Sequence, residues 1–224
     1  YLINNILAEI AIQDNLPFEA YNYYNKCIDI YPDCDSIIAL KGQCYYEKYM
    51  YQAAINNFTK AIGITYRMNA DYYASRGKSF SKLKEHRKAE SDFNEAIKID
   101  PNNAEYHLLK GMGDLDQNKN SSAIRSFTKS LDLKKGYVAY YKRGNAKYKL
   151  GKLADAISDY TYSINTTSAF KSDKDYAKAY RNRGIARYET CKDGACADLK
   201  KAGDLGDNKA YNEYKRISNK NECN

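Results

Sequence analysis

Proline, glycine and tryptophan are scarce in this chain of 224 residues, which contains three prolines, twelve glycines and no tryptophan. A loop-rich β-sandwich would need turn residues about every 8–12 positions, and a collagen-like chain would be dominated by glycine. No apolar run approaches the ~20 uncharged residues that a membrane-spanning helix requires. The sequence therefore predicts a helical protein that does not insert into a membrane.

The net charge of +8 is distributed unevenly along the chain. The first 50 residues hold three basic and seven acidic side chains, whereas residues 51–224 hold 33 basic and 21 acidic ones. Because positive charge attracts acidic molecules, we expect an acidic partner to prefer the later part of the chain. No targeting segment is recognisable, so a periplasmic or cell-envelope location and a cytoplasmic one both stay open.

A glycine preceded by lysine or arginine recurs every 33 to 40 residues, as Lys41-Gly42, Arg76-Gly77, Lys110-Gly111, Arg143-Gly144 and Arg183-Gly184. About twelve residues after each glycine comes an alanine, then an aromatic residue or leucine four positions later, then a small residue three positions further on. Spacings of 3, 4 and 7 place side chains on one helical face, so each unit predicts two amphipathic helices. Glycine within a helix costs ~1 kcal/mol relative to alanine, and its recurrence indicates that two helices approach closely there.

These positions resemble the tetratricopeptide repeat, a helix-turn-helix unit of 34 residues with aromatic, glycine, alanine and proline positions at fixed offsets. The resemblance covers nearly the whole chain and implies an all-α, right-handed superhelical solenoid of about six hairpins in a single domain, residues 1–224. A helix at 207–218 is expected to cap the last apolar surface. The C-terminal ending is also similar to that of many such proteins from Bacteroidetes-type bacteria. The expected repeats are 1–34, 35–69, 70–103, 104–136, 137–176 and 177–206.

No sequence motif marks a catalytic or metal site. The two histidines, His86 and His107, have no neighbouring Cys/His pair or HExxH pattern of the kind that ligates a metal. The Gly-Met-Gly sequence at 111–113 lacks the third glycine of a phosphate-binding pattern. We therefore predict that the chain is not an enzyme and uses no metal or cofactor.

The resemblance implies a concave groove lined by the first helices of successive repeats. The groove positions are apolar in the middle of the chain and become basic and tyrosine-rich toward its end, and tyrosine and arginine are enriched in binding hot spots. The expected partner-binding residues are Leu108, Met112, Tyr141, Lys142, Asn145, Tyr148, Lys178, Arg181 and Tyr188.

These features favour a non-enzymatic scaffold that holds a peptide or a helix of another protein, in particular an acidic one, in the groove. The alternative is nucleic-acid binding through the basic, tyrosine-rich C-terminal repeats. Glu105, Asp114 and Asp116 interrupt the basic stripe and disfavour this alternative. A clamp for a partner's C-terminal carboxylate, which some relatives use, is disfavoured because only Asn145 and Asn182 occupy matching positions.

Comparing the repeats with one another predicts a recurring ion pair. Arginine precedes the glycine in repeats three, five and six, and only these repeats have aspartate just before the later aromatic residue or leucine. A buried guanidinium needs a paired head group, and a carboxylate accepts two parallel hydrogen bonds from it. The predicted pairs are Arg76 with Asp92, Arg143 with Asp159, and Arg183 with Asp198.

The six cysteines include no Cys-x-x-Cys motif, which argues against ordinary zinc-ribbon and thioredoxin-like sites. The capping helix can bring Cys223 back toward the last hairpin. We therefore predict a disulfide between Cys223 and either Cys191 or Cys196 in an oxidising compartment, with free thiols as the alternative.

Overall fold

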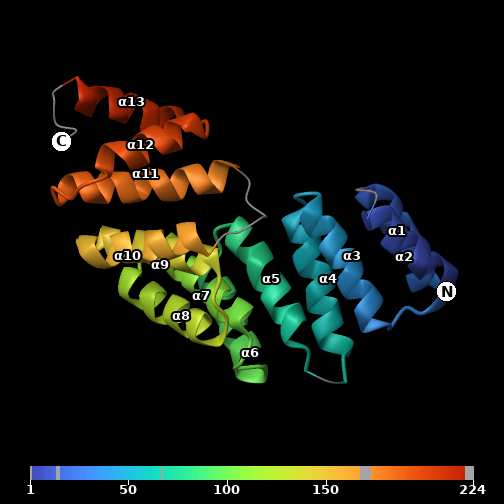
Figure 1. Cartoon of the computed structure of the whole chain (residues 1–224). Coiled ribbons are helices and arrows are strands. Elements are labelled where there is room, and N and C mark those ends of the chain that lie inside the picture. Colours follow the sequence, from blue (N-terminus) through green and yellow to red (C-terminus); the bar gives the residue numbers. More distant parts are fainter. Residues whose placement is uncertain (1, 14–15, 67, 167–172, 220–224) are drawn as a thin grey trace. The chain divides into compact units, whose positions relative to one another are not determined.

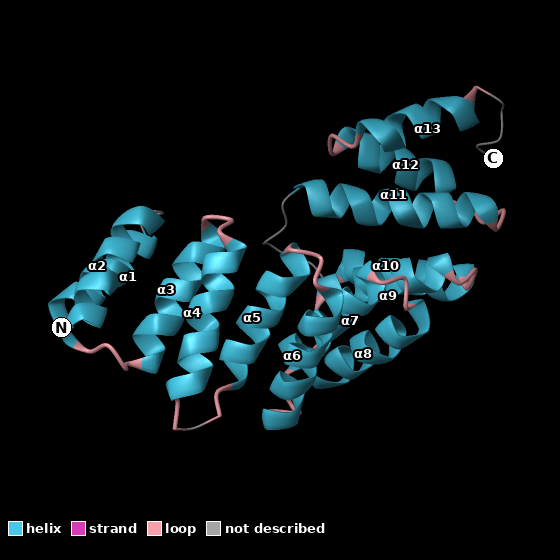
Figure 2. Ribbon diagram, turned by 180° about the vertical axis from the view of Figure 1, so that it is seen from behind, coloured by secondary structure: helices cyan, strands magenta, loops and turns pink. Residues whose placement is uncertain are grey.

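The computed structural model describes residues 2–13, 16–66, 68–166 and 173–219, and these residues form thirteen α-helices and no strand (Figures 1 and 2). The expected all-helical repeat fold is confirmed. In chain order the helices are α1 (Leu2–Gln13) and α2 (Pro17–Ile30), α3 (Asp35–Glu47) and α4 (Tyr51–Ile64), α5 (Ala70–Lys82) and α6 (His86–Ile99), α7 (Ala104–Asp116) and α8 (Asn120–Leu133), α9 (Tyr137–Lys149) and α10 (Leu153–Asn165), α11 (Asp173–Glu189) and α12 (Ala195–Asp204), and finally α13 (Asn208–Ser218).

The helix starts follow the predicted repeat frame closely. In repeats two to five the first helix begins at the first predicted residue, which is Asp35, Ala70, Ala104 or Tyr137. The sixth repeat differs, because α11 begins at Asp173, four positions before the predicted start. The rings of Tyr176 and Tyr180 meet edge to face at 4.9 Å, and such i,i+4 aromatic contacts stabilise the additional helical turn.

The chain divides into two compact units, residues 1–113 and residues 114–224, with the boundary inside α7. We call them the N-terminal unit and the C-terminal unit and describe each by itself. A single domain over residues 1–224 stays a prediction. No helix among the described residues has the length and apolar character that crossing a membrane requires.

The core of each unit is built from the small and aromatic residues that define the repeat. In α6, Ala89, Phe93 and Ala96 are at most 2% exposed, and they pack against Ala70 and Ala74 of α5. The same pattern recurs in α4 and α10. The recurring period therefore reports which face of each second helix is buried.

The glycine of the repeat lets an aromatic ring lie directly against the backbone of the first helix. A Cβ atom added to Gly77 would come within 2.7 Å of the Phe93 ring, and one added to Gly144 would come within 2.8 Å of the Tyr160 ring. Contacts below 3.0 Å force a neighbour to move. The cost of glycine in the helix is thus offset by closer packing.

We predict that Gly77→Ala destabilises the protein by about 1–3 kcal/mol, because the added methyl group overpacks the core at Phe93. The matched control is Gly63→Ala in α4, where no atom lies within 4 Å of the added Cβ. That change should stabilise the helix by up to ~1 kcal/mol. Urea unfolding of both variants measures the difference, and equal effects would contradict the packing role of Gly77.

Candidate functional site

The structure brings together all three predicted arginine–aspartate pairs. In each pair the guanidinium donates from Nε and Nη2 to the two carboxylate oxygens, at 2.7–2.9 Å. The aspartates are between 2% and 4% exposed, so this bidentate contact is formed inside the hairpin. The pairs are Arg76 with Asp92, Arg143 with Asp159, and Arg183 with Asp198.

Each of these arginines also reaches the preceding repeat. The Nη1 atom donates to a threonine hydroxyl in the second helix of that repeat, at 3.0–3.1 Å. Sequence reasoning missed these threonines, although they recur in the repeat frame and an internal comparison could have found them. The threonines bound by Arg76, Arg143 and Arg183 are Thr59, Thr128 and Thr161 respectively.

Repeat four shows what replaces the arginine contact. Lys110 stands in the arginine position and donates to Asn94, the residue at the threonine position of repeat three. The carboxylate is now on the first helix, where Asp114 accepts hydrogen bonds from Ser122 at 2.8 Å and Ser126 at 3.4 Å. The ammonium group of Lys110 thus keeps the hydrogen bond to the preceding repeat but makes no bidentate contact within its own hairpin.

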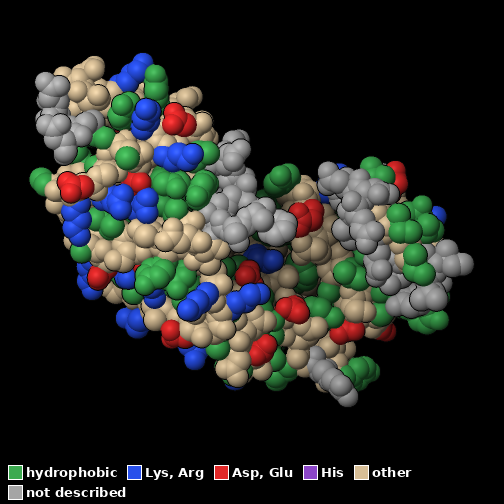
Figure 3. All heavy atoms as spheres, viewed as in Figure 1, with side chains coloured by type: hydrophobic (Ala, Val, Ile, Leu, Met, Phe, Trp, Pro, Cys, Tyr) green, Lys and Arg blue, Asp and Glu red, His purple; other side chains and the backbone are tan. Residues whose placement is uncertain are grey.

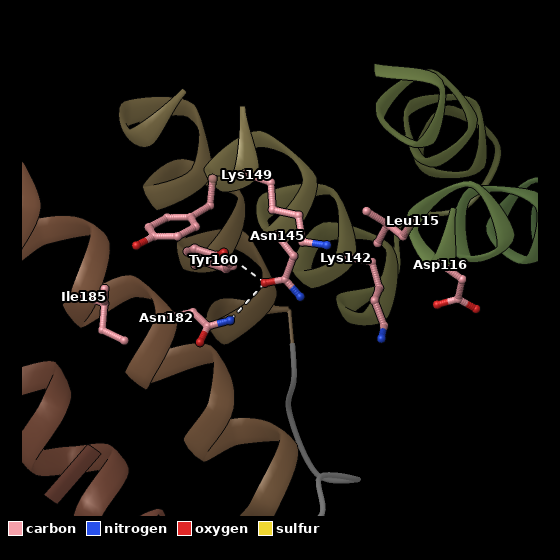
Figure 4. Close-up of a pocket in the computed structure, with 9 residues that line it drawn as sticks. Leu115, Asp116, Lys142, Asn145, Lys149, Tyr160, Asn182 and Ile185 are labelled. Atoms are coloured by element: carbon pink, nitrogen blue, oxygen red, sulfur yellow. Dashed lines mark hydrogen bonds between the residues drawn. The ribbon is translucent and has the colours of Figure 1, made fainter. Parts of the chain in front are cut away.

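A pocket of about 420 Å³ lies in the C-terminal unit (Figure 4). Three of the predicted groove residues, Lys142, Asn145 and Tyr148, line it because their spacing of three places them on one face of α9. Helices α7, α10 and α11 supply further walls. The complete lining is Leu115, Asp116, Lys142, Asn145, Tyr148, Lys149, Tyr160, Asn182 and Ile185.

A hydrogen-bonded network fixes the orientation of the Asn145 amide. Its Oδ1 atom accepts from the Tyr160 hydroxyl at 2.9 Å and from Asn182 Nδ2 at 2.9 Å, as the dashed lines in Figure 4 show. Asn182 Nδ2 also donates to the Tyr141 hydroxyl at 3.2 Å. Because the Oδ1 atom accepts both of these hydrogen bonds, the orientation of the amide is fixed, and its Nδ2 atom points away from Tyr160 and Asn182. No described residue accepts a hydrogen bond from that nitrogen.

The two tyrosines of the lining stay neutral at physiological pH. Burial raises the pKa of Tyr148 to about 12, and the hydrogen bond that Tyr148 donates to Glu189 acts in the same direction. Burial also raises the pKa of Tyr160. Both phenols therefore remain hydrogen-bond donors rather than negative charges beside the pocket.

Six predicted groove residues do not line this pocket. Arg181 instead donates to Asp207 at 2.7 Å, and Tyr188 packs against the core around Leu199 and Ile217. The sequence pattern places these side chains on the expected helix. It does not reveal their contacts with residues outside the repeat, such as Asp207. The six residues are Leu108 and Met112, which belong to the N-terminal unit, and Tyr141, Lys178, Arg181 and Tyr188.

The net positive charge belongs to the C-terminal unit. It contains 23 basic and 14 acidic residues, a net charge of +9, whereas the N-terminal unit contains 13 basic and 14 acidic residues, a net charge of −1. Figure 3 shows many lysine and arginine side chains on one face of the C-terminal unit. An acidic molecule is therefore attracted to the unit that contains the pocket.

The cysteines of the last hairpin differ from each other. Cys196 is part of a disulfide, whereas Cys191 is a free and exposed thiol. Cys223 lies outside the described residues, and so does any pairing with it. Among the described residues no cluster of histidine, cysteine, aspartate and glutamate could hold a metal ion.

A family model described as the tetratricopeptide repeat matches residues 70–103, the third predicted repeat. Residues 70–103 are a tetratricopeptide repeat. The DnaJ homolog subfamily C member 7 homolog of Dictyostelium discoideum is 27% identical over 207 residues, which cover 85% of this chain and 37% of that protein. The human DnaJ homolog subfamily C member 7 is 32% identical over 51% of this chain and 24% of its own length.

Among solved structures, the chain is similar to YrrB, which is described as a TPR protein with an unusual peptide-binding site. The TM-score is 0.67 at 17% identity, over 86% of this chain and 97% of YrrB. This likeness shows the fold. The chain spans well under half the length of the two DnaJ-related proteins named above. The comparisons do not support the resemblance of the ending to Bacteroidetes-type proteins.

We predict that Asp159→Ala destabilises the protein by about 1–3 kcal/mol, and more than Asp159→Asn does. Alanine leaves the guanidinium of Arg143 and the ammonium of Lys147 without their acceptor, whereas asparagine keeps one oxygen. Asp155→Ala, at an exposed position of the same helix, is the control and should change stability little. Chemical denaturation measures all three, and equal losses for alanine and asparagine at 159 would contradict the role of the pair.

Proposed function

We propose that the C-terminal unit binds a segment of a partner protein that inserts an acidic group into the pocket between α9 and α11. Tetratricopeptide repeats act in protein–protein interaction, and a pocket of about 420 Å³ holds one or two side chains rather than a whole helix. We therefore expect the pocket to bind one anchoring group of the partner, while the surrounding surface contacts the rest of the segment.

Two hydrogen-bond donors on α9, Asn145 and Lys142, support this proposal. The amide nitrogen of Asn145 has no acceptor among the described residues, and the Lys142 ammonium, 6.0 Å from the centre of the Tyr141 ring, forms no ion pair with any of them. A carboxylate accepts hydrogen bonds from both an amide and an ammonium group, and hydrogen bonds to charged partners are the stronger ones. The pair is therefore suited to an acidic side chain or a chain terminus.

The remaining walls add a preference for an apolar neighbour. Leu115 and Ile185 supply aliphatic surface, and Tyr148 and Tyr160 supply aromatic rings. Burial of an aliphatic side chain against them contributes ~25 cal/mol for each Å² removed from water. Asp116, on the same lining, repels a second acidic group. We therefore expect one acidic residue beside a leucine-like residue.

We predict that Lys142→Glu and Asn145→Ala each weaken binding of an acidic peptide at least tenfold. The probe is the strongest ligand selected from a displayed library of random nonapeptides, labelled with fluorescein and measured by fluorescence anisotropy. Lys142→Glu places a negative charge opposite the ligand, and Asn145→Ala removes the amide donor. Lys152→Glu makes the same charge change at an exposed position outside the pocket lining and should weaken binding less than about twofold.

The same variants decide between this proposal and nucleic-acid binding. Phosphate contacts are spread over a surface and weaken steeply with salt. If a single-stranded oligonucleotide binds more tightly than any selected peptide, and Lys152→Glu weakens it as much as Lys142→Glu, the nucleic-acid alternative is correct. Selected peptides without acidic residues would also contradict the proposal.

A further inference from the structure

Asp207 connects the capping helix α13 to α11 through two sets of hydrogen bonds. Asp207 Oδ1 accepts hydrogen bonds from the backbone amides of Lys209 and Ala210 at 3.1 Å, which caps the N-terminus of α13. Asp207 Oδ2 accepts from Arg181 Nη1 at 2.7 Å. The Asp207 side chain is only 10% exposed, so water competes weakly for this contact.

The contact continues from Arg181 into the pocket. Arg181 Nε donates to Asn182 Oδ1 over a long 3.4 Å, and Asn182 Nδ2 donates to Asn145 Oδ1 at 2.9 Å. The oxygen of Asn182 thus faces a cation and its nitrogen faces α9, which fixes the direction of this amide as well. An unbroken series of hydrogen bonds leads from the start of α13 to the Asn145 amide.

We propose that Asp207 and Arg181 are positioning residues for the pocket, so that the capping helix is part of the binding device. The inference rests on the proposed function. If the guanidinium moves away, the Asn182 amide can turn over and place its oxygen against Asn145 Oδ1. That arrangement is repulsive, and Asn145 relieves it by turning its own oxygen toward the bound acidic group.

The alternative is that Arg181 contacts the ligand directly, as the groove pattern predicted. The two roles predict opposite effects of one substitution. Asp207→Asn keeps the capping oxygen, because asparagine is as good an N-cap as aspartate, but removes the charge that holds Arg181. If Arg181 positions Asn182, binding weakens. If Arg181 is a ligand contact, the released guanidinium strengthens binding.

We predict that Asp207→Asn weakens binding of the selected nonapeptide about fivefold or more and moves the side-chain amide signals of Asn145 and Asn182 in the ¹⁵N NMR spectrum of the free protein. Arg181→Gln should do the same, and it replaces Asp207→Asn as the test variant if that protein does not fold. The matched control is Arg216→Gln, which breaks the pair with Glu213 on α13 and should leave binding and both signals unchanged.

Unmoved amide signals in Asp207→Asn and Arg181→Gln, or tighter peptide binding by Asp207→Asn, would overturn the positioning role. The NMR measurement uses the protein without ligand, so it judges that role separately from the proposed function. Moved amide signals together with peptide binding that is insensitive to Lys142→Glu would support the positioning network and refute the acidic-group site.

Discussion

The bidentate contact between arginine and aspartate fixes the rotation of the first helix about its axis in repeats three, five and six. Arg143 is held by Asp159 on one side and by Thr128 of the preceding repeat on another. With one side chain of α9 fixed in this way, the 100° step between residues directs Lys142 and Asn145 to the pocket. Buried ion pairs contribute little to net stability, so their main effect here is on orientation.

Two aspartates of the C-terminal unit each bind two cations. Asp159 accepts from Lys147 as well as Arg143, and Asp198 accepts from Arg187 as well as Arg183. Both second cations stand four residues after the first, one helical turn away. In repeats five and six the buried carboxylate thus has two cationic partners, and much of the basic character of α9 and α11 is used inside the fold.

The repeat period and the residues that recur in it were enough to predict the helices, the core faces and the ion pairs. They were enough because residue spacing alone determines which side chains share a helix face. The repeat frame also placed the start of α9 at Tyr137. No pocket was predicted, but part of the predicted groove lies at it. Lys142, Asn145 and Tyr148 line it, but Arg181 turns to Asp207, a residue beyond the last repeat. A periodic pattern describes positions within a repeat, so it cannot anticipate a partner outside the frame.

The positive charge at the pocket comes from the basic side chains that form no ion pair with an aspartate of the fold. The guanidinium and ammonium groups on α9 and α11 that meet aspartates are neutralised internally and cannot attract a ligand strongly. Lys149 donates to the neutral amide of Asn118, and Lys142 meets no carboxylate among the described residues, so both retain their charge at the lining. Counting basic residues in the sequence overestimates the charge available for binding, because aspartates of the fold pair with five basic residues of α9 and α11. The cations held by aspartates are Arg143, Lys147, Arg181, Arg183 and Arg187.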